Sequence, residues 1–137
     1  MRKNLICCLL VAVFSQLVFA HGEDQKGPHG GYVRMPGAFH TELVQDGKNK
    51  IKVYLLDIDW KNPSIRESSV KAFLKLKKNK NLESKCEVMQ DYFSCTFAES
   101  VDLGKKGELK IMPIREGQKG NAAVYRLPFA LDAAQDM

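Results

Sequence analysis

The chain has 137 residues, of which 45% are hydrophobic and 27% are charged, and its formal net charge is +5 at pH 7. This length suits one domain with a substantial core and is short for two. The basic excess is mild, and no run of arginine or basic motif interleaved with aromatic residues accompanies it. The composition therefore does not indicate a protein that binds nucleic acid.

The first 20 residues have the pattern of a secretory signal peptide. Two cations at positions 2–3 precede an apolar stretch over 5–13, and a small-residue cleavage site ends at Ala20. The apolar stretch is shorter than the roughly 20 residues that cross a bilayer, so we expect cleavage rather than a retained anchor. The exported chain is then expected in the periplasm or a similar space, soluble and without a stable membrane span.

Residues 21–31, HGEDQKGPHGG, contain almost no apolar side chain and carry glycine and proline at short intervals. This composition predicts a flexible N-terminal arm. We expect a single ordered domain over residues 32–131, followed by a tail over residues 132–137.

Apolar and polar residues alternate over 39–44 and again over 51–55, which is the period of half-buried strands. The segment between them contains Asp46-Gly47, a pair typical of hairpin turns. Two antiparallel strands joined by a short turn are therefore predicted here.

After a longer connection over 59–68, alternation resumes over 69–77, and further strands are predicted at 109–114 and 123–130. Pro113 and Pro128 are expected at edges or bulges. Seven or eight short strands with frequent turn signals predict an all-β fold, an antiparallel immunoglobulin-like β-sandwich, with a small β-barrel as the alternative.

Lysines gather on one face of the strand predicted at 69–77, where Lys71, Lys75 and Lys77 alternate with apolar residues. We interpret this face as solvated, because lysine also discourages pairing between sheet edges. A docking surface for an acidic partner is the alternative.

Cys86 and Cys95 are placed symmetrically about Gln90-Asp91, so a hairpin that turns there sets them directly opposite each other. The register makes them a non-hydrogen-bonded pair, whose Cα separation of about 4.5 Å is near the lower end of what a disulfide tolerates. No Cys-X-X-Cys spacing or nearby histidine supports a redox or metal-binding thiol pair. A structural disulfide is therefore predicted.

Two histidines and a carboxylate lie close together in the stretch KGPHGGYVRMPGAFHTELV. His40 and Glu42 are two apart on a predicted strand and so project from the same face. A turn at Pro36-Gly37 would bring His29 back beside them. Imidazole is a good donor to copper and zinc at neutral pH, so His29, His40 and Glu42 form a candidate metal site.

Cleavage after Ala20 would add a fourth candidate ligand. His21 would then be the first residue, with its free α-amine and its imidazole on one residue. These two nitrogens can chelate Cu(II), and a further imidazole can complete the site. A shift of the cleavage point by one residue would remove this arrangement.

The segments PHGGYV, FHTELV and KIKVYLLDID, over residues 27–59, resemble a small exported β-domain. That domain begins GPHGG, continues with a His-x-Glu-Leu strand, and occurs alone or ahead of the periplasmic adaptor subunits of heavy-metal efflux pumps. The resemblance implies handling of copper and related divalent ions. The positions of this chain that match the motif are His29, Gly30, Gly31, His40 and Glu42.

These observations predict a periplasmic protein that binds or relays a divalent metal ion, Cu(II) or Zn(II), in metal efflux or resistance. A heavy-metal efflux adaptor or another envelope protein is the expected partner. The alternative is an immunoglobulin-like interaction module of the envelope with no metal role.

Enzymatic activity is not predicted. The sequence contains no Gly-x-Ser-x-Gly elbow, no phosphate-binding glycine loop and no His-Glu-x-x-His motif. The paired carboxylates of Asp57 and Asp59 precede an Asn-Pro turn, which makes a cap at the end of a strand the simpler interpretation.

Overall fold

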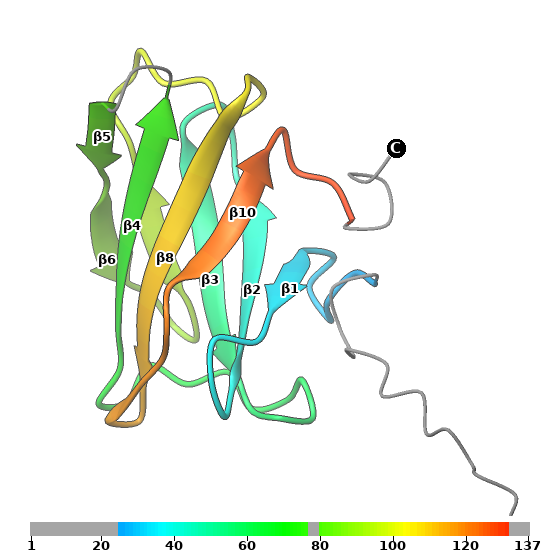
Figure 1. The fold of residues 1–137 in the computed structure, drawn as a ribbon. Helices are drawn as coiled ribbons and strands as arrows, with labels where there is room; N and C mark the ends of the chain where they lie inside the picture. Colours follow the sequence, from blue (N-terminus) through cyan, green and yellow to red (C-terminus); the bar gives the residue numbers. More distant parts are fainter. Residues whose placement is uncertain (1–24, 77–79, 132–137) are drawn as a thin grey trace, which may run out of the picture.

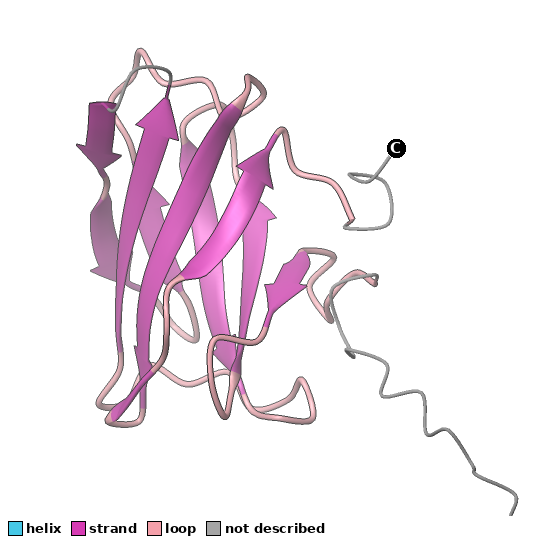
Figure 2. Ribbon diagram, in the orientation of Figure 1, coloured by secondary structure: helices cyan, strands magenta, loops and turns pink. Residues whose placement is uncertain are grey.

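The computed structural model describes residues 25–76 and 80–131, and within them the chain forms ten strands and no helix (Figures 1 and 2). The signal peptide predicted over 1–20, His21 and the tail predicted over 132–137 lie outside these residues. No helix in the described part is long and apolar enough to cross a membrane.

The strands form two antiparallel sheets that face each other (Figure 1). The first sheet has the order β1 (Tyr32–Arg34), β2 (His40–Gln45), β3 (Lys50–Leu56), β7 (Phe93–Thr96) and β6 (Lys85–Val88). The second has the order β10 (Ala123–Leu127), β8 (Gly107–Arg115), β4 (Ser69–Leu76) and β5 (Lys80–Glu83), with β9 (Gln118–Lys119) paired to β8.

The predicted β-sandwich is confirmed, and the sheets are not closed into a barrel. The structure has ten strands where seven or eight were expected. Strand β1 has three residues and β9 has two, which are too few to display an alternating pattern. These two strands are therefore recognised by their pairing in the structure and not from the sequence.

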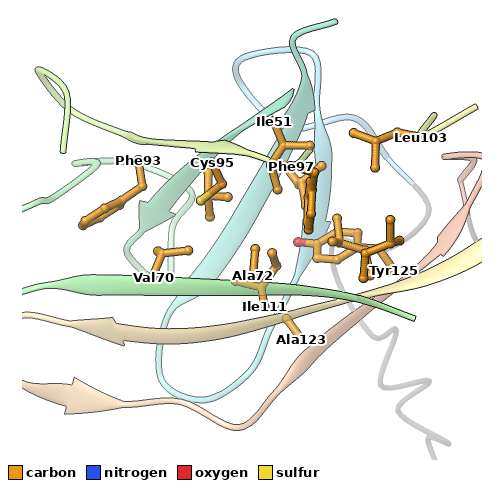
Figure 3. Packing of buried hydrophobic residues seen from close by; sticks show 14 of the residues in the cluster. Ile51, Val70, Ala72, Phe93, Cys95, Phe97, Leu103, Ile111, Ala123 and Tyr125 are labelled. Atoms are coloured by element: carbon orange, nitrogen blue, oxygen red, sulfur yellow. The ribbon is translucent and has the colours of Figure 1, made fainter. Parts of the chain in front are cut away.

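The core lies between the sheets and is built from the alternate residues that each strand turns inward (Figure 3). Leu43 of β2 and Ile51 of β3 face Ala72 of β4 and Ile111 of β8, and all four are fully buried. The same alternation leaves the lysines of β4 on the outside, as predicted. Each sheet therefore has one apolar inner face and one outer face.

The hairpin of β6 and β7 has the predicted register. Cys86 pairs with Cys95, and the two form a disulfide with their Cα atoms 4.0 Å apart. Cys95 is fully buried in the core, whereas Cys86 is partly exposed at the edge strand. The predicted structural disulfide is thus confirmed.

Pro113 lies in β8, opposite Val70 of β4. Its carbonyl accepts the amide of Gly120 on the other side of the strand, and pairing with β10 reaches only Ile111. In an extended strand the nitrogen of a residue faces the same side as its carbonyl, so the nitrogen of Pro113 lies between the end of the β10 pairing at Ile111 and the start of the β9 pairing at Ile114. Its missing N–H therefore removes no bond to β4. Pro128 follows the end of β10.

Candidate functional site

The candidate site lies on the outer face of the first sheet, over the pair of β2 and β3. Glu42 stands directly opposite Tyr54, and His40 stands opposite Leu56. Their neighbours Thr41 and Leu43 point into the core, so His40 and Glu42 share the outer face, as their spacing predicted. Glu42 is nevertheless completely buried, because another segment covers it.

That segment is the turn formed by residues 27–31, GPHGG. The amide of Gly27 donates to the carbonyl of Gly31, and the amide of Gly30 donates to the carbonyl of Gly27, at 2.8 and 2.9 Å. The turn begins next to a bridge between Lys26 and Tyr32. Residues 25–31, expected within a flexible arm, therefore form an ordered turn that lies against β2.

Two glycines let this turn approach β2 closely. A Cβ on Gly27 would overlap the carboxylate of Glu42, and a Cβ on Gly31 would lie 2.6 Å from the carbonyl oxygen of Leu43. Gly30 has a φ of 74°, a conformation that favours glycine. Gly27 and Gly31 therefore leave room for the buried side chain of Glu42.

The carboxylate of Glu42 accepts three hydrogen bonds, all from the turn. Its Oε2 accepts the backbone amides of His29 and Gly31 at 2.8 and 3.0 Å, and its Oε1 lies 2.5 Å from Nδ1 of His29. An ionised carboxylate can only accept, so with Glu42 ionised the proton of this bond is on Nδ1 of His29. In the neutral imidazole the lone pair is then on Nε2.

Nε2 of His29 makes no hydrogen bond within the described residues, and the His29 side chain is 31% exposed. The structure thus presents one imidazole at the surface with a fixed tautomer and orientation. This is the form in which histidine binds a metal ion or accepts a proton.

Tyr54 lies beneath the imidazole, which stacks on the phenol ring with the centroids 3.7 Å and the planes 5° apart. Burial raises the pKa of the Tyr54 phenol, and the negative charge of Asp91 raises it further. The platform under His29 is therefore uncharged at neutral pH. Our sequence reasoning missed this residue, although the hairpin register places it opposite Glu42.

His40 is engaged elsewhere. It is 3% exposed, its Nδ1 donates to the backbone carbonyl of Asp57 at 3.1 Å, and its ring lies in a T-shaped contact with the ring of Trp60. Among the described residues, no group of three or more His, Cys, Asp or Glu side chains is arranged to hold a metal ion. Of the predicted ligands, the structure brings His29 and Glu42 together, and His21 lies outside the described residues.

The loop after β3 is held by the carboxylate of Asp57. Its Oδ1 accepts the amides of Asp59 and Lys61 at 2.9 Å each, and its Oδ2 accepts the side-chain amide of Asn62 at 2.8 Å. The bond from Lys61 is the largest cause of the lowered pKa of Asp57. The interpretation of Asp57 as a cap at the end of a strand is confirmed.

The fold and site together define a disulfide-linked β-sandwich that carries a carboxylate-oriented surface imidazole. Comparison of the chain with protein-family models, curated proteins and solved structures finds no match.

Proposed function

We propose that the chain is an exported metal-handling protein that binds a divalent ion, Cu(II) or Zn(II), through Nε2 of His29. The observation that carries the proposal is the bond between His29 Nδ1 and the buried carboxylate of Glu42. Histidine ligands of metals commonly donate their other ring N–H to a carboxylate, which orients the ring and raises its basicity. The Cys86–Cys95 disulfide supports an oxidising, exported location.

Glu42 has an orienting role in this proposal and is not itself a ligand. Its side chain has no exposed surface, and its oxygens already accept three hydrogen bonds. His40 is similarly occupied at Nδ1. The described residues thus supply one prepared ligand, whereas a structural zinc site needs about four.

The remaining donors in the proposal come from the N-terminal segment. His21 precedes His29 by eight residues, and with cleavage after Ala20 it would offer an α-amine and an imidazole. A site with one fixed ligand and others on a terminal segment suits transfer of an ion more than permanent storage. We therefore favour a relay role, with the adaptor of a heavy-metal efflux pump as the proposed recipient, and a binding function without catalysis.

The test is a calorimetric titration with Cu(II) and with Zn(II) of the protein whose first residue is His21. We expect sub-micromolar binding that weakens below about pH 6 as imidazole protonates. His29→Ala should abolish this binding, and Glu42→Gln should weaken it by about tenfold or more. His40→Ala is the matched control on the same face and should bind as wild type does.

Wild-type affinity in the His29→Ala variant would overturn the proposal. If Glu42→Gln binds the metal with wild-type affinity while His29→Ala does not, the carboxylate does not have the proposed orienting role. Replacement of His21 by alanine tests the terminal donors separately from the ordered turn.

A further inference from the structure

The second sheet has an outer face on the opposite side of the sandwich from His29. We call the outward side chains of β4, β8 and β10, with those adjoining them from β5 and β9, the basic face. The charged members are Lys71, Lys75, Lys110, Lys119, Arg126, Glu83 and Glu108. Its apolar members include Phe73, Met112, Ile114 and Val124.

The charge of this face is unbalanced. Five cations face two carboxylates, and the five make no ion pair within the described part of the chain. Glu108 of β8 has Lys75 of β4 and Arg126 of β10 as its cross-strand partners, whereas the cross-strand partner of Lys71 is Met112. A surface with this excess attracts anionic groups over about a Debye length.

Protection of a sheet edge does not explain Lys75 and Lys110. Lys75 stands between Asn81 of β5 and Glu108 of β8, and Lys110 stands between strands β4 and β10, whereas Lys71 lies beyond the end of the β5 pairing. Edge protection also gives no reason for large apolar side chains to point outward at Phe73 and Met112. The interpretation as a solvated face, which the sequence favoured, leaves these two features unexplained.

Two shallow hollows adjoin Phe73 and Met112. One, of about 240 Å³, is also lined by Lys75, Glu108 and Lys110. The other, of about 350 Å³, is also lined by Lys71, Ile114 and Lys119 among others. Each hollow therefore has apolar walls beside a charged rim that is mainly cationic, the arrangement of an apolar centre and polar border that protein interfaces use.

We propose that the basic face binds an acidic polypeptide segment whose bulky apolar side chains enter the two hollows. Carboxylates of the segment would pair with Lys71, Lys75 and Lys110, and an aromatic or branched side chain would pack against Phe73 and Met112. An anionic lipid surface would also meet the cations, but it would leave hollows of side-chain size unfilled. The interaction does not involve His29, which lies on the other outer face.

The probe for this proposal is a short synthetic peptide with a central phenylalanine flanked by glutamates. Two matched peptides replace the glutamates by glutamine or the phenylalanine by serine. Binding is measured by fluorescence anisotropy and mapped by amide chemical shifts of the labelled protein. We expect saturable binding by the first peptide, weaker binding by both others, and shifts concentrated in β4 and β8.

Variants of the protein make the test specific. Lys71→Glu combined with Lys110→Glu should weaken binding by about tenfold or more, and Met112→Ser should weaken it without a change of charge. Lys48→Glu combined with Lys85→Glu changes the net charge equally at exposed lysines outside the basic face and should have little effect. Thermal unfolding of each variant verifies its folding, and His29→Ala should bind the peptide as wild type does.

The proposal is overturned if no peptide binds saturably at millimolar concentration, or if the two double variants lose affinity equally. It is also overturned if phosphatidylglycerol vesicles bind the protein more tightly than the peptide and Met112→Ser leaves that binding unchanged, since the face would then recognise an anionic membrane.

Discussion

The imidazole of His29 lies flat on the phenol ring of Tyr54, with the ring planes only 5° apart. The edge of the same imidazole meets the carboxylate of Glu42 through Nδ1. Because Glu42 and Tyr54 are direct cross-strand neighbours, one pair of residues fixes the ring in two directions. The surface histidine is therefore held by the sheet and does not depend on the stiffness of its own turn.

Glu42→Ala should lower the free energy of unfolding by roughly 2–4 kcal/mol, because it leaves the buried amide of Gly31 and the partly buried amide of His29 without an acceptor. Glu42→Gln should cost less, since its amide oxygen can still accept one or two of these bonds. Urea unfolding followed by circular dichroism measures both. Stability equal to wild type in Glu42→Ala would mean that the turn is not anchored through this carboxylate.

Gly31→Ala should destabilise the protein by about 1–3 kcal/mol, because the new methyl group would meet the backbone carbonyl of Leu43 and the side chain of Val44. Neither neighbour is the far end of a long flexible side chain. Gly37→Ala is the matched control, since its Cβ would have only ordinary contacts, the nearest at 3.8 Å. It should change stability by less than about 0.5 kcal/mol.

Local signals were sufficient for the larger hairpins. The Asp-Gly pair marks the turn between β2 and β3, and the symmetry of Cys86 and Cys95 about their turn fixes the register of β6 and β7. Both signals come from residues near one another in the sequence. Which residues of β2 and β4 point inward was also predictable, because the alternation of apolar and polar residues is a local signal too.

The turn over residues 27–31 could not be predicted as ordered, because what holds it is distant in the sequence. Its composition is that of a flexible segment, and its stabilisation comes from a carboxylate thirteen residues beyond His29. Burial of Glu42 is likewise invisible in the sequence, where an acidic residue on an outer strand face is expected in solvent. The shared face of His40 and Glu42 was predictable, but the attachment of His40 to the carbonyl of Asp57 was not.

Removal of the disulfide by Cys86→Ser and Cys95→Ser together should lower the free energy of unfolding by roughly 2–3 kcal/mol. The bridge closes a loop with a sequence separation of 9, for which the chain-entropy estimate is modest. Serine at position 95 also places a hydroxyl in the core, so Cys86→Ala with Cys95→Ala serves as the apolar comparison. Both variants should keep the amide pattern of β6 and β7, and its loss would mean that the bridge determines the hairpin register.

Asp57→Ala should destabilise the protein in a manner that depends on pH. The pKa of Asp57 is lowered in the folded state, with the amide of Lys61 as the largest cause, so folding favours the ionised form. For such a group the stabilisation is present above the unfolded pKa of about 3.9 and is lost as pH falls through the folded pKa. The difference in free energy of unfolding between wild type and Asp57→Ala should therefore be largest near neutral pH and shrink below about pH 4.

Asp59→Ala is the matched control, because the Asp59 side chain makes no hydrogen bond within the described residues. Urea unfolding at a series of pH values measures both differences, and a constant difference for Asp57→Ala down to the lowest pH would show that the charge of Asp57 does not hold the loop.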